Sequence, residues 1–212
     1  MRKTSFKSLH DNRKKFLEEN KCKDHVVISG TNNVLISAPH GVSQVRLGRL
    51  KYQEIGSLTT ALYLHKATNS YLIAKTKNNN DDANFDECCR YRDSIDRLVD
   101  SGVIKYLIDM HGLGAHRKCD INLGVNLGKN IETNVKLLDN LKRALKNAGF
   151  CVVIDQPFMA GGITISGGMK LRHPELWTIQ IEINCAITNR PENFEKYSKL
   201  LCVLREWIDG LE

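Results

Sequence analysis

The stretch Val103-Ile-Lys-Tyr-Leu-Ile-Asp-Met-His111-Gly112 decides the fold that this sequence predicts. A short apolar run that ends in a histidine and a glycine is typical of a buried strand that delivers a polar side chain at its carboxyl end. The same arrangement occurs in Val34-Leu-Ile-Ser-Ala-Pro-His40-Gly41. In open α/β sheets the carboxyl ends of the strands form the ligand crevice. We therefore expect His40 and His111 to converge on one site.

Extended and helical patterns alternate along the chain around these two runs. Short apolar or β-branched runs predict strands over residues 26–28, 34–36, 71–74, 103–108, 119–124, 151–154 and 177–183. Apolar residues at helical spacing predict helices over residues 53–67, 88–99, 132–148 and 193–208. This alternation predicts an α/β fold, in which a single domain has a mixed, largely parallel sheet flanked by helices.

The connections between these elements have turn chemistry. Residues 30–33, Gly-Thr-Asn-Asn, predict that the strands on either side of them pair as a hairpin. Residues 42–51 and the glycine-rich stretch 157–168 are expected as loops. Residues 77–84 form the longest expected loop, and long loops often meet substrate.

The length and the apolar pattern describe a globular protein. The 212 residues suit one domain, with residues 1–24 expected as a basic amphipathic helical segment packed on a domain of residues 25–212. No apolar stretch approaches the roughly 18 residues of a membrane span. Residues 1–7 lack the apolar segment of a secretory signal. We therefore expect a cytoplasmic protein with no membrane partner.

The charges and the cysteines argue against two classes of site. The formal net charge is +7, and the basic residues spread over 2–23, 46–51, 90–97 and 136–146. They lack the interleaved aromatic residues of a stacking platform, so they indicate solvated helix faces first and attraction of an acidic substrate second. We expect no nucleic-acid partner. The 7 cysteines include no CxxC pair, which predicts reduced thiols rather than a cysteine-held zinc.

A glutamate in a later strand completes the chemistry that the two histidines suggest. In Thr178-Ile-Gln-Ile-Glu182-Ile-Asn184 the isoleucines share one face, and Glu182 shares the other with Gln180. On an edge strand this polar face would be solvated, whereas on a central strand it must line a cavity, because an unpaired buried carboxylate is costly. Asp109, two residues before His111, is placed either to orient an imidazole or to cap a loop. Two imidazoles, an acidic ligand and a spare glutamate are the parts of a hydrolytic zinc centre.

Five motifs lie in order along residues 34–190. They are Ser37-Ala-Pro-His40-Gly41, Asp81-Asp-Ala-Asn84-Phe85-Asp86, Ile108-Asp-Met-His111-Gly112, Pro157-Phe-Met-Ala-Gly161-Gly162-Ile-Thr164 and Ile179-Gln-Ile-Glu182-Ile. Together they resemble the N-formylglutamate amidohydrolase family. The resemblance implies a phosphorylase/hydrolase-like α/β fold, related to the zinc carboxypeptidases. It also implies metal-dependent cleavage of an amide beside a carboxylate.

The resemblance implies a role for each residue of the metal centre. His40 and His111 become zinc ligands, and Glu182 becomes the general base. Glu54, at the start of the expected helix 53–67, looks like the acidic third ligand of the family. Its other interpretation is a carboxylate that complements the positive end of the helix. Imidazole and carboxylate ligands also accept divalent ions other than zinc.

Substrate-binding residues are expected around this centre. Asp82 and Asn84 resemble the loop motif of the family that meets substrate, although the arginine that often accompanies it is absent beside Asn84. Gly162 would let the backbone approach a ligand closely, or it simply forms a turn. A basic residue is expected to bind the carboxylate of the substrate, and the candidates are Arg92, Arg117 and Arg190. The alternative for each is an arginine on the surface with no such role.

These residues predict a zinc-dependent amidohydrolase. Its substrate is expected to be an N-formyl or N-acyl amino acid or a small acidic peptide, cleaved by a zinc-activated water with Glu182 as the base. The alternative is a non-catalytic metal- or ligand-binding protein on the same fold, because a fold does not fix a function. The sequence carries no signal for an oligomeric state.

Overall fold

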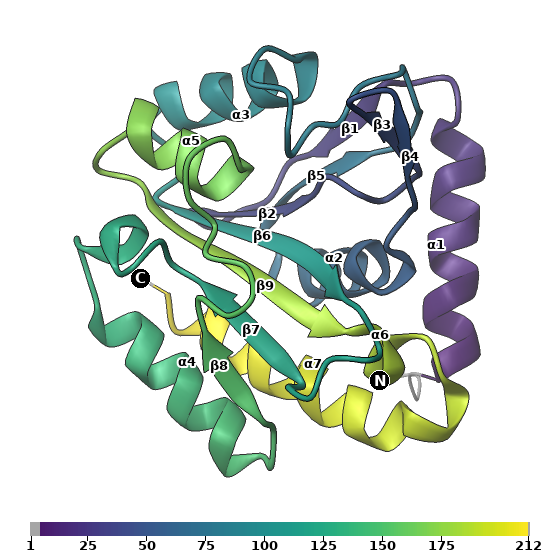
Figure 1. The fold of residues 1–212 in the computed structure, drawn as a ribbon, viewed down its shortest axis with the longest axis vertical. Coiled ribbons are helices and arrows are strands. Elements are labelled where there is room, and N and C mark those ends of the chain that lie inside the picture. Colours follow the sequence, from purple (N-terminus) through teal and green to yellow (C-terminus); the bar gives the residue numbers. More distant parts are fainter. Residues whose placement is uncertain (1–4, 212) are drawn as a thin grey trace.

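Seven strands form one twisted sheet in the computed structural model, which describes residues 5–211 (Figure 1). The strands are β1 (His25–Ile28), β2 (Val34–Ala38), β5 (Tyr71–Lys75), β6 (Tyr106–Leu113), β7 (Ile121–Gly124), β8 (Val152–Ile154) and β9 (Trp177–Asn184), in the order β1-β5-β2-β6-β9-β7-β8. β5, β2, β6 and β9 pair in parallel, and so do β7 and β8. β1 and β7 run antiparallel to β5 and β9. The expected α/β fold with a mixed, largely parallel sheet is thus confirmed.

Helices cover both faces of this sheet (Figure 1). They are α1 (Phe6–Asn20), α2 (Ile55–Thr68), α3 (Arg90–Asp100), α4 (Lys136–Asn147), α5 (Ile165–Arg172), α6 (Cys185–Thr188) and α7 (Phe194–Asp209), with short 3₁₀ turns at Lys129–Ile131 and Pro191–Asn193. Leu58 of α2, Leu141 of α4 and Leu204 of α7 belong to the larger core. Ile95 of α3 and Met169 of α5 belong to a smaller core on the opposite face. Each face of the sheet is therefore buried by its own set of helices.

The sheet face under α3 and α5 changes from apolar to polar along its strands. On β6, Leu107 packs into the smaller core, and Asp109 and His111 follow on the same face. On β9, Gln180 and Glu182 stand in register with Asp109 and His111. These polar positions lie toward the carboxyl ends of parallel strands, where α/β folds place their ligands.

Three local expectations were wrong. β1 and β2 do not form a hairpin, because β5 lies between them and pairs with both. Residues 42–51 are not simply a loop, since they contain a small hairpin of β3 (Gln44–Arg46) and β4 (Arg49–Lys51). The glycine-rich stretch 157–168 runs into α5, whose first turn is capped by the Thr164 hydroxyl accepting from the Gly167 N–H at 3.1 Å.

The helix α1 packs on the rest of the chain through apolar side chains, which include the partly buried Phe16 and Leu17, and through a buried basic side chain. Leu9 belongs to the larger core. Arg13 is buried and donates to the Gly41 carbonyl at 3.2 Å and to Gln53 Oε1 at 2.6 Å. Among the described residues, no helix combines the length and the apolar character that crossing a bilayer requires.

Candidate metal centre and pocket

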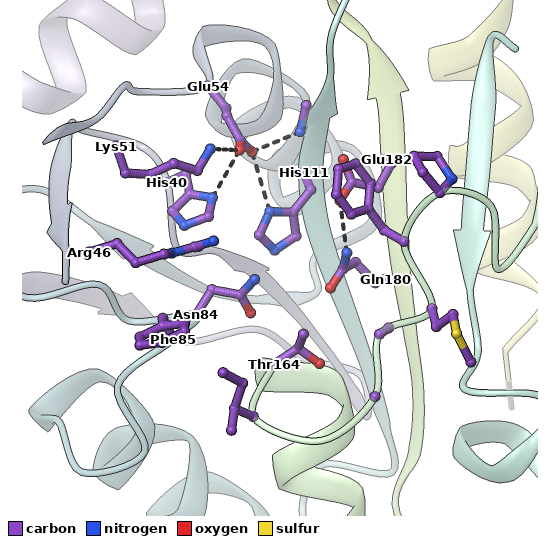
Figure 2. Close-up of a pocket in the computed structure, with 17 residues that line it drawn as sticks. His40, Arg46, Lys51, Glu54, Asn84, Phe85, His111, Thr164, Gln180 and Glu182 are labelled. Carbon is purple, nitrogen blue, oxygen red and sulfur yellow. Dashed lines mark hydrogen bonds and ion pairs between the residues drawn. The ribbon is translucent and has the colours of Figure 1, made fainter. Parts of the chain in front are cut away.

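A pocket of about 550 Å³ opens at the carboxyl ends of β2, β6 and β9 (Figure 2). His40, Glu54, His111 and Glu182 lie on one side of it. The remaining lining residues are Arg46, Lys51, Asn84, Phe85, Gly112, Pro157, Phe158, Met159, Ala160, Gly161, Ile163, Thr164 and Gln180. The pocket thus combines a polar floor on the sheet with a cationic hairpin and an apolar loop.

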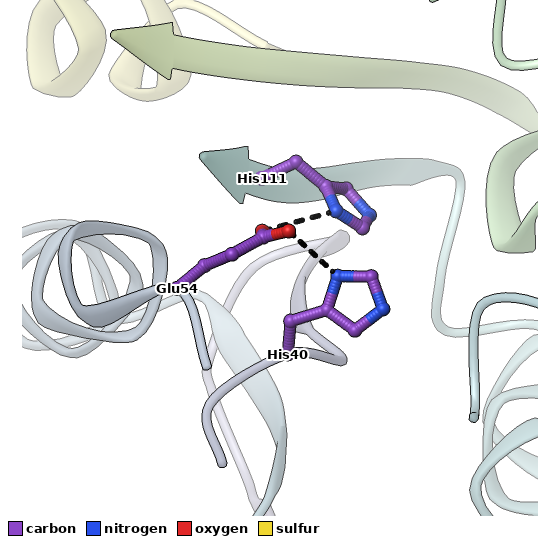
Figure 3. A group of neighbouring side chains, drawn as sticks. All are labelled: His40, Glu54 and His111. Carbon is purple, nitrogen blue, oxygen red and sulfur yellow. Dashed lines mark hydrogen bonds and ion pairs between the residues drawn. The ribbon is translucent and has the colours of Figure 1, made fainter. Parts of the chain in front are cut away.

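His40, Glu54 and His111 meet at the floor of this pocket (Figure 3). His40 follows β2, Glu54 immediately precedes α2, and His111 lies within β6 rather than beyond its end. One potential ligand atom from each residue lies within 4.8 Å of the other two. Segments far apart in the sequence therefore present two imidazoles and one carboxylate to a single point.

Backbone contacts hold Glu54 in this position. Its own N–H donates to the His40 carbonyl at 2.9 Å, which ties the start of α2 to the end of β2. Its carboxylate Oε2 accepts from the Gly112 N–H at 2.7 Å. A Cβ at Gly112 would lie 3.2 Å from the Glu54 Cβ, so glycine leaves the room that this close approach needs.

Each imidazole presents one nitrogen to Glu54 and the other to a second carboxylate. The Nδ1 atoms of His40 and His111 lie 2.9 Å and 3.3 Å from the Glu54 oxygens. The Nε2 atom of His40 donates to Asp82 at 3.0 Å, and that of His111 donates to Asp109 at 3.0 Å. A carboxylate behind an imidazole fixes the ring and its tautomer in many metal sites.

The charges of this cluster depend on one another. Burial alone would raise the pKa of the Glu54 carboxyl, but the imidazoles of His40 and His111 hold it well below its usual range. Burial alone would lower the pKa of the His111 imidazole, but Asp109 and Glu54 raise it well above its usual value. The ionised carboxyl of Glu54 and the protonated imidazole of His111 therefore stabilise each other.

The donor set fits a divalent metal ion. Two imidazole nitrogens and one carboxylate are a common three-residue ligand set of catalytic zinc, and other divalent ions accept them too. An ion held by these residues would take the place of any proton on the imidazole nitrogens that face it. Glu54 Oε1 also accepts from Lys51 Nζ at 2.5 Å, so a metal ion would compete with this ammonium group.

Glu182 stands beside the three ligand residues without belonging to them. It lies opposite His111 on β9, and β9 is flanked by β6 and β7, so the polar face of this strand lines a cavity instead of meeting solvent. Burial, together with the charge of Glu54, raises the pKa of Glu182 to about 7 against the opposing influence of His111. A carboxyl group with this pKa can both accept and donate a proton near neutral pH.

The cationic side of the pocket comes from the β3–β4 hairpin. The Arg46 guanidinium lies 5.3 Å above the Phe85 ring and donates from Nε to Asp82 at 2.7 Å. Asn84 Oδ1 accepts from the Ile165 N–H at 2.8 Å, so the NH₂ group of this amide turns toward the pocket (Figure 2). Arg46 and Asn84 thus offer N–H donors above the floor on which the metal ligands lie.

The structure places Arg92 away from the pocket, contrary to its predicted contact with a substrate carboxylate. Its side chain is only 1% exposed and donates to the backbone carbonyls of Ala83, Ile163 and Thr164. The guanidinium therefore ties the 81–86 loop to the start of α5. Its role is to support the pocket wall.

Four other predicted substrate contacts also lie elsewhere. Asp82 is fully buried and reaches only His40, Arg46 and nearby backbone groups, so it supports the centre from behind. Gly162 is exposed and has a left-handed φ of 55°, so it forms a turn, which was the alternative to a close contact with a ligand. Arg117 and Arg190 are exposed and do not line the pocket. Asn84 is the one predicted substrate residue among the lining residues of the described chain.

Sequence reasoning missed Arg46, Lys51 and Gln180 as pocket residues. Arg46 and Lys51 lie in a basic stretch between the predicted ligands His40 and Glu54, and this position was the available signal. Gln180 was placed on the face of Glu182 by strand alternation but was given no role. The short segment between His40 and Glu54 keeps these two cationic residues close to the candidate metal centre.

Solved structures of the same fold include known hydrolases. A scan against protein-family models and a search of curated proteins both find no match. The gene product Atu2144 from Agrobacterium tumefaciens is similar with a TM-score of 0.67 at 13% identity, covering 92% of this chain and 96% of that one. N-formylglutamate amidohydrolase from Ralstonia eutropha JMP134 is similar with a TM-score of 0.62 at 13% identity, covering 88% and 97%. A bacteriophage poly-gamma-glutamate hydrolase is similar with a TM-score of 0.54 at 12% identity, covering 87% of each chain. The chain therefore has the α/β fold that N-formylglutamate amidohydrolase and related hydrolases share.

Proposed function

We propose that this protein is a metal-dependent amidohydrolase that cleaves an N-acyl amino acid or a small acidic peptide. One observation carries the proposal: His40, Glu54 and His111 present their ligand atoms within 4.8 Å of one another, and Glu182 faces the same pocket. A divalent ion such as zinc, bound there, supplies a Lewis acid that polarises a carbonyl and makes water more acidic. The fold shared with known hydrolases supports this proposal.

Glu182 is the proton carrier in this proposal. With a pKa of about 7, its carboxylate accepts a proton from the attacking water and returns it to the leaving nitrogen. Asp82 and Asp109 hold the two imidazoles, so that their Nδ1 atoms stay aimed at the same point as Glu54.

The cations of the β3–β4 hairpin favour an acidic substrate. Arg46 uses Nε for Asp82, which leaves the outer nitrogens of its guanidinium for a carboxylate in the pocket. The formal net charge of +7 attracts anions to the molecule as a whole. Two structures of the same fold are named for glutamate derivatives, which supports a substrate of this class.

Elemental analysis and turnover test the proposal together. Wild type is expected to hold about one divalent ion per chain when loaded with zinc, and His40→Ala and His111→Ala are expected to lose it. His116→Ala, which removes an exposed histidine outside the pocket, serves as the control. N-formyl- and N-acetyl-glutamate and short glutamyl peptides form the substrate panel. Metal binding without turnover on the whole panel would favour the non-catalytic alternative, and failure to bind any divalent ion would refute the metal centre.

A further inference from the structure

Gln180 has a buried oxygen that no group of the described chain satisfies. The side chain is 3% exposed, and its Nε2 donates to Glu182 Oε1 at 2.8 Å. The Oε1 atom of the same amide has no hydrogen-bond partner among the described residues. Gln180 lines the pocket, and Figure 2 shows this oxygen on the side of the amide that faces away from Glu182. A buried acceptor without a donor costs free energy, so this oxygen calls for a donor from outside the chain.

The orientation of this amide is set by its neighbour. Glu182 is an acceptor when ionised, so the NH₂ group of Gln180 must face it and the oxygen must face away. The strand is central and Gln180 stands in register with the buried Asp109, which leaves the amide little freedom to turn. The acceptor is therefore built into the floor of the pocket beside the proton carrier.

We propose that Gln180 determines specificity by accepting a hydrogen bond from the N–H of the scissile amide. This inference rests on the proposed function, because it assumes that an amide nitrogen reaches Glu182. To receive a proton from Glu182, that nitrogen must come within hydrogen-bond distance of the carboxyl group. Gln180 contacts the same carboxyl group, so an N–H on this nitrogen is the ligand donor that lies nearest to the unpaired oxygen.

The contact makes the site selective for secondary amides over esters. In an ester of the same shape, an oxygen replaces the N–H and turns its lone pairs toward Gln180 Oε1. Both acceptors would then be buried without a donor. Sites built to hydrogen-bond a substrate N–H discriminate strongly against analogues that lack it, because their own polar group is left unpaired.

A matched pair of ligands tests this contact. N-acetyl-L-glutamate carries the amide N–H, and 2-acetoxyglutarate replaces it with an ester oxygen. Each is titrated calorimetrically into zinc-loaded protein to give Kd, and kcat/KM is measured wherever cleavage occurs. The variants are Gln180→Met, which keeps the length of the side chain without an acceptor, and Thr178→Val as the control. Thr178 lies on the same face of β9 and is buried, but it does not line the pocket, and its hydroxyl donates to the Ser166 carbonyl at 3.0 Å.

The inference predicts that Gln180→Met loses affinity for the amide ligand but not for the ester. Wild type and Thr178→Val bind the amide about tenfold more tightly than the ester, and Gln180→Met abolishes this difference by weakening amide binding alone. Equal weakening of both ligands in Gln180→Met would overturn the inference, since it would leave Gln180 as a mere support for Glu182. A tenfold difference in Kd without any cleavage would keep the inference and refute the proposed function. Binding of neither ligand would refute both.

Discussion

Two buried clusters of charge in this protein differ in what neutralises their carboxylates. In the first, which we call the lysine cluster, the fully buried Lys75 Nζ lies 2.6 Å from both Asp24 and Asp81. In the second, the metal centre, Glu54 lies between His40 and His111. The lysine cluster contains its own permanent cation. Glu54 of the candidate metal centre also pairs with the partly exposed Lys51, but its two buried partners are imidazoles, whose protons a metal ion can replace.

The difference shows how buried carboxylates with basic partners can stabilise the fold in one place and form a candidate binding site in another. Lys75 lies on β5, and its two carboxylates hold the segment before β1 and the long loop after β5. Lys75, Asp24 and Asp81 are not among the residues that line the pocket at the candidate metal centre. The carboxylates of the lysine cluster pair with an ammonium group, whereas Glu54 lies between imidazoles, which can bind a metal ion in place of protons.

The largest expected effect belongs to the proton carrier of the metal centre. Glu182→Gln keeps the shape of the side chain but removes its proton transfer, so kcat is expected to fall by about 10²–10⁴-fold. Metal content should stay at the wild-type value, because Glu182 is not among the three ligand residues. Steady-state kinetics on the cleaved substrate and elemental analysis check both statements, with the exposed Glu175→Gln as control. Unchanged kcat in Glu182→Gln would remove this residue from the reaction.

Substitution in the lysine cluster is expected to lower the free energy of unfolding without changing metal binding. Lys75→Met leaves two carboxylates without their cation, and loss of one partner from a buried ion pair costs about 3–5 kcal/mol. Urea unfolding measures this loss, and metal content of the folded protein should not change. Lys196→Met removes a partly exposed lysine that pairs with Asp120 and should cost about 1 kcal/mol or less. A loss in Lys75→Met as small as that would show that the cluster is not truly buried.

A smaller effect is expected from the carboxylates behind the imidazoles. Asp109→Asn weakens the hydrogen bond that aims His111, and such changes typically lower metal affinity by about 10–100-fold. Competition with a chromogenic chelator measures this affinity. Asp96→Asn disturbs a carboxylate–histidine pair outside the pocket, where Asp96 accepts from His173 at 2.9 Å, and is the matched control. Equal metal affinity in Asp109→Asn and wild type would show that His111 is aimed by the strand alone.

The sequence predicted the sheet and the convergence of His40, Glu54 and His111 better than the walls of the pocket. Short apolar runs begin β2 and β6, and β9 alternates isoleucines with polar residues, so the position of these strands and the convergence of His40 and His111 could be inferred. The pairing of β1 could not be inferred, because the sequence around Gly30 is typical of a hairpin turn. In the structure, a Cβ at Gly30 would lie 2.4 Å from the Asn69 carbonyl oxygen, so this glycine allows close packing against the connection to β5.

The arginines show why the substrate side was harder to predict. Arg92 and Arg46 look equivalent in sequence, since each lies within a short basic stretch. Tertiary packing buries Arg92 against backbone carbonyls and leaves Arg46 on the pocket. The alternation of a strand can assign a face to Gln180, but it cannot show that one oxygen of its amide stays without a partner.

Asp24 of the lysine cluster and His111 of the candidate metal centre should respond to pH with opposite sign when the metal is removed by a chelator. Burial alone would raise the pKa of Asp24, but hydrogen bonds from Lys75 and His25 hold it below its usual value, so its stabilisation is present above about pH 4 and is lost as the pH falls further. His111 has a raised pKa, so its stabilisation is present below about pH 6.5 and is lost as the pH rises through its folded value. The free energy of unfolding, measured with urea between about pH 3 and 9, should therefore have a smaller acid slope in Asp24→Asn and a smaller alkaline slope in His111→Asn. Glu54 keeps part of the acid slope in Asp24→Asn, because its pKa is also held below its usual range. An alkaline slope that stays unchanged in His111→Asn, or that changes in Asp24→Asn, would show that His111 is not its source.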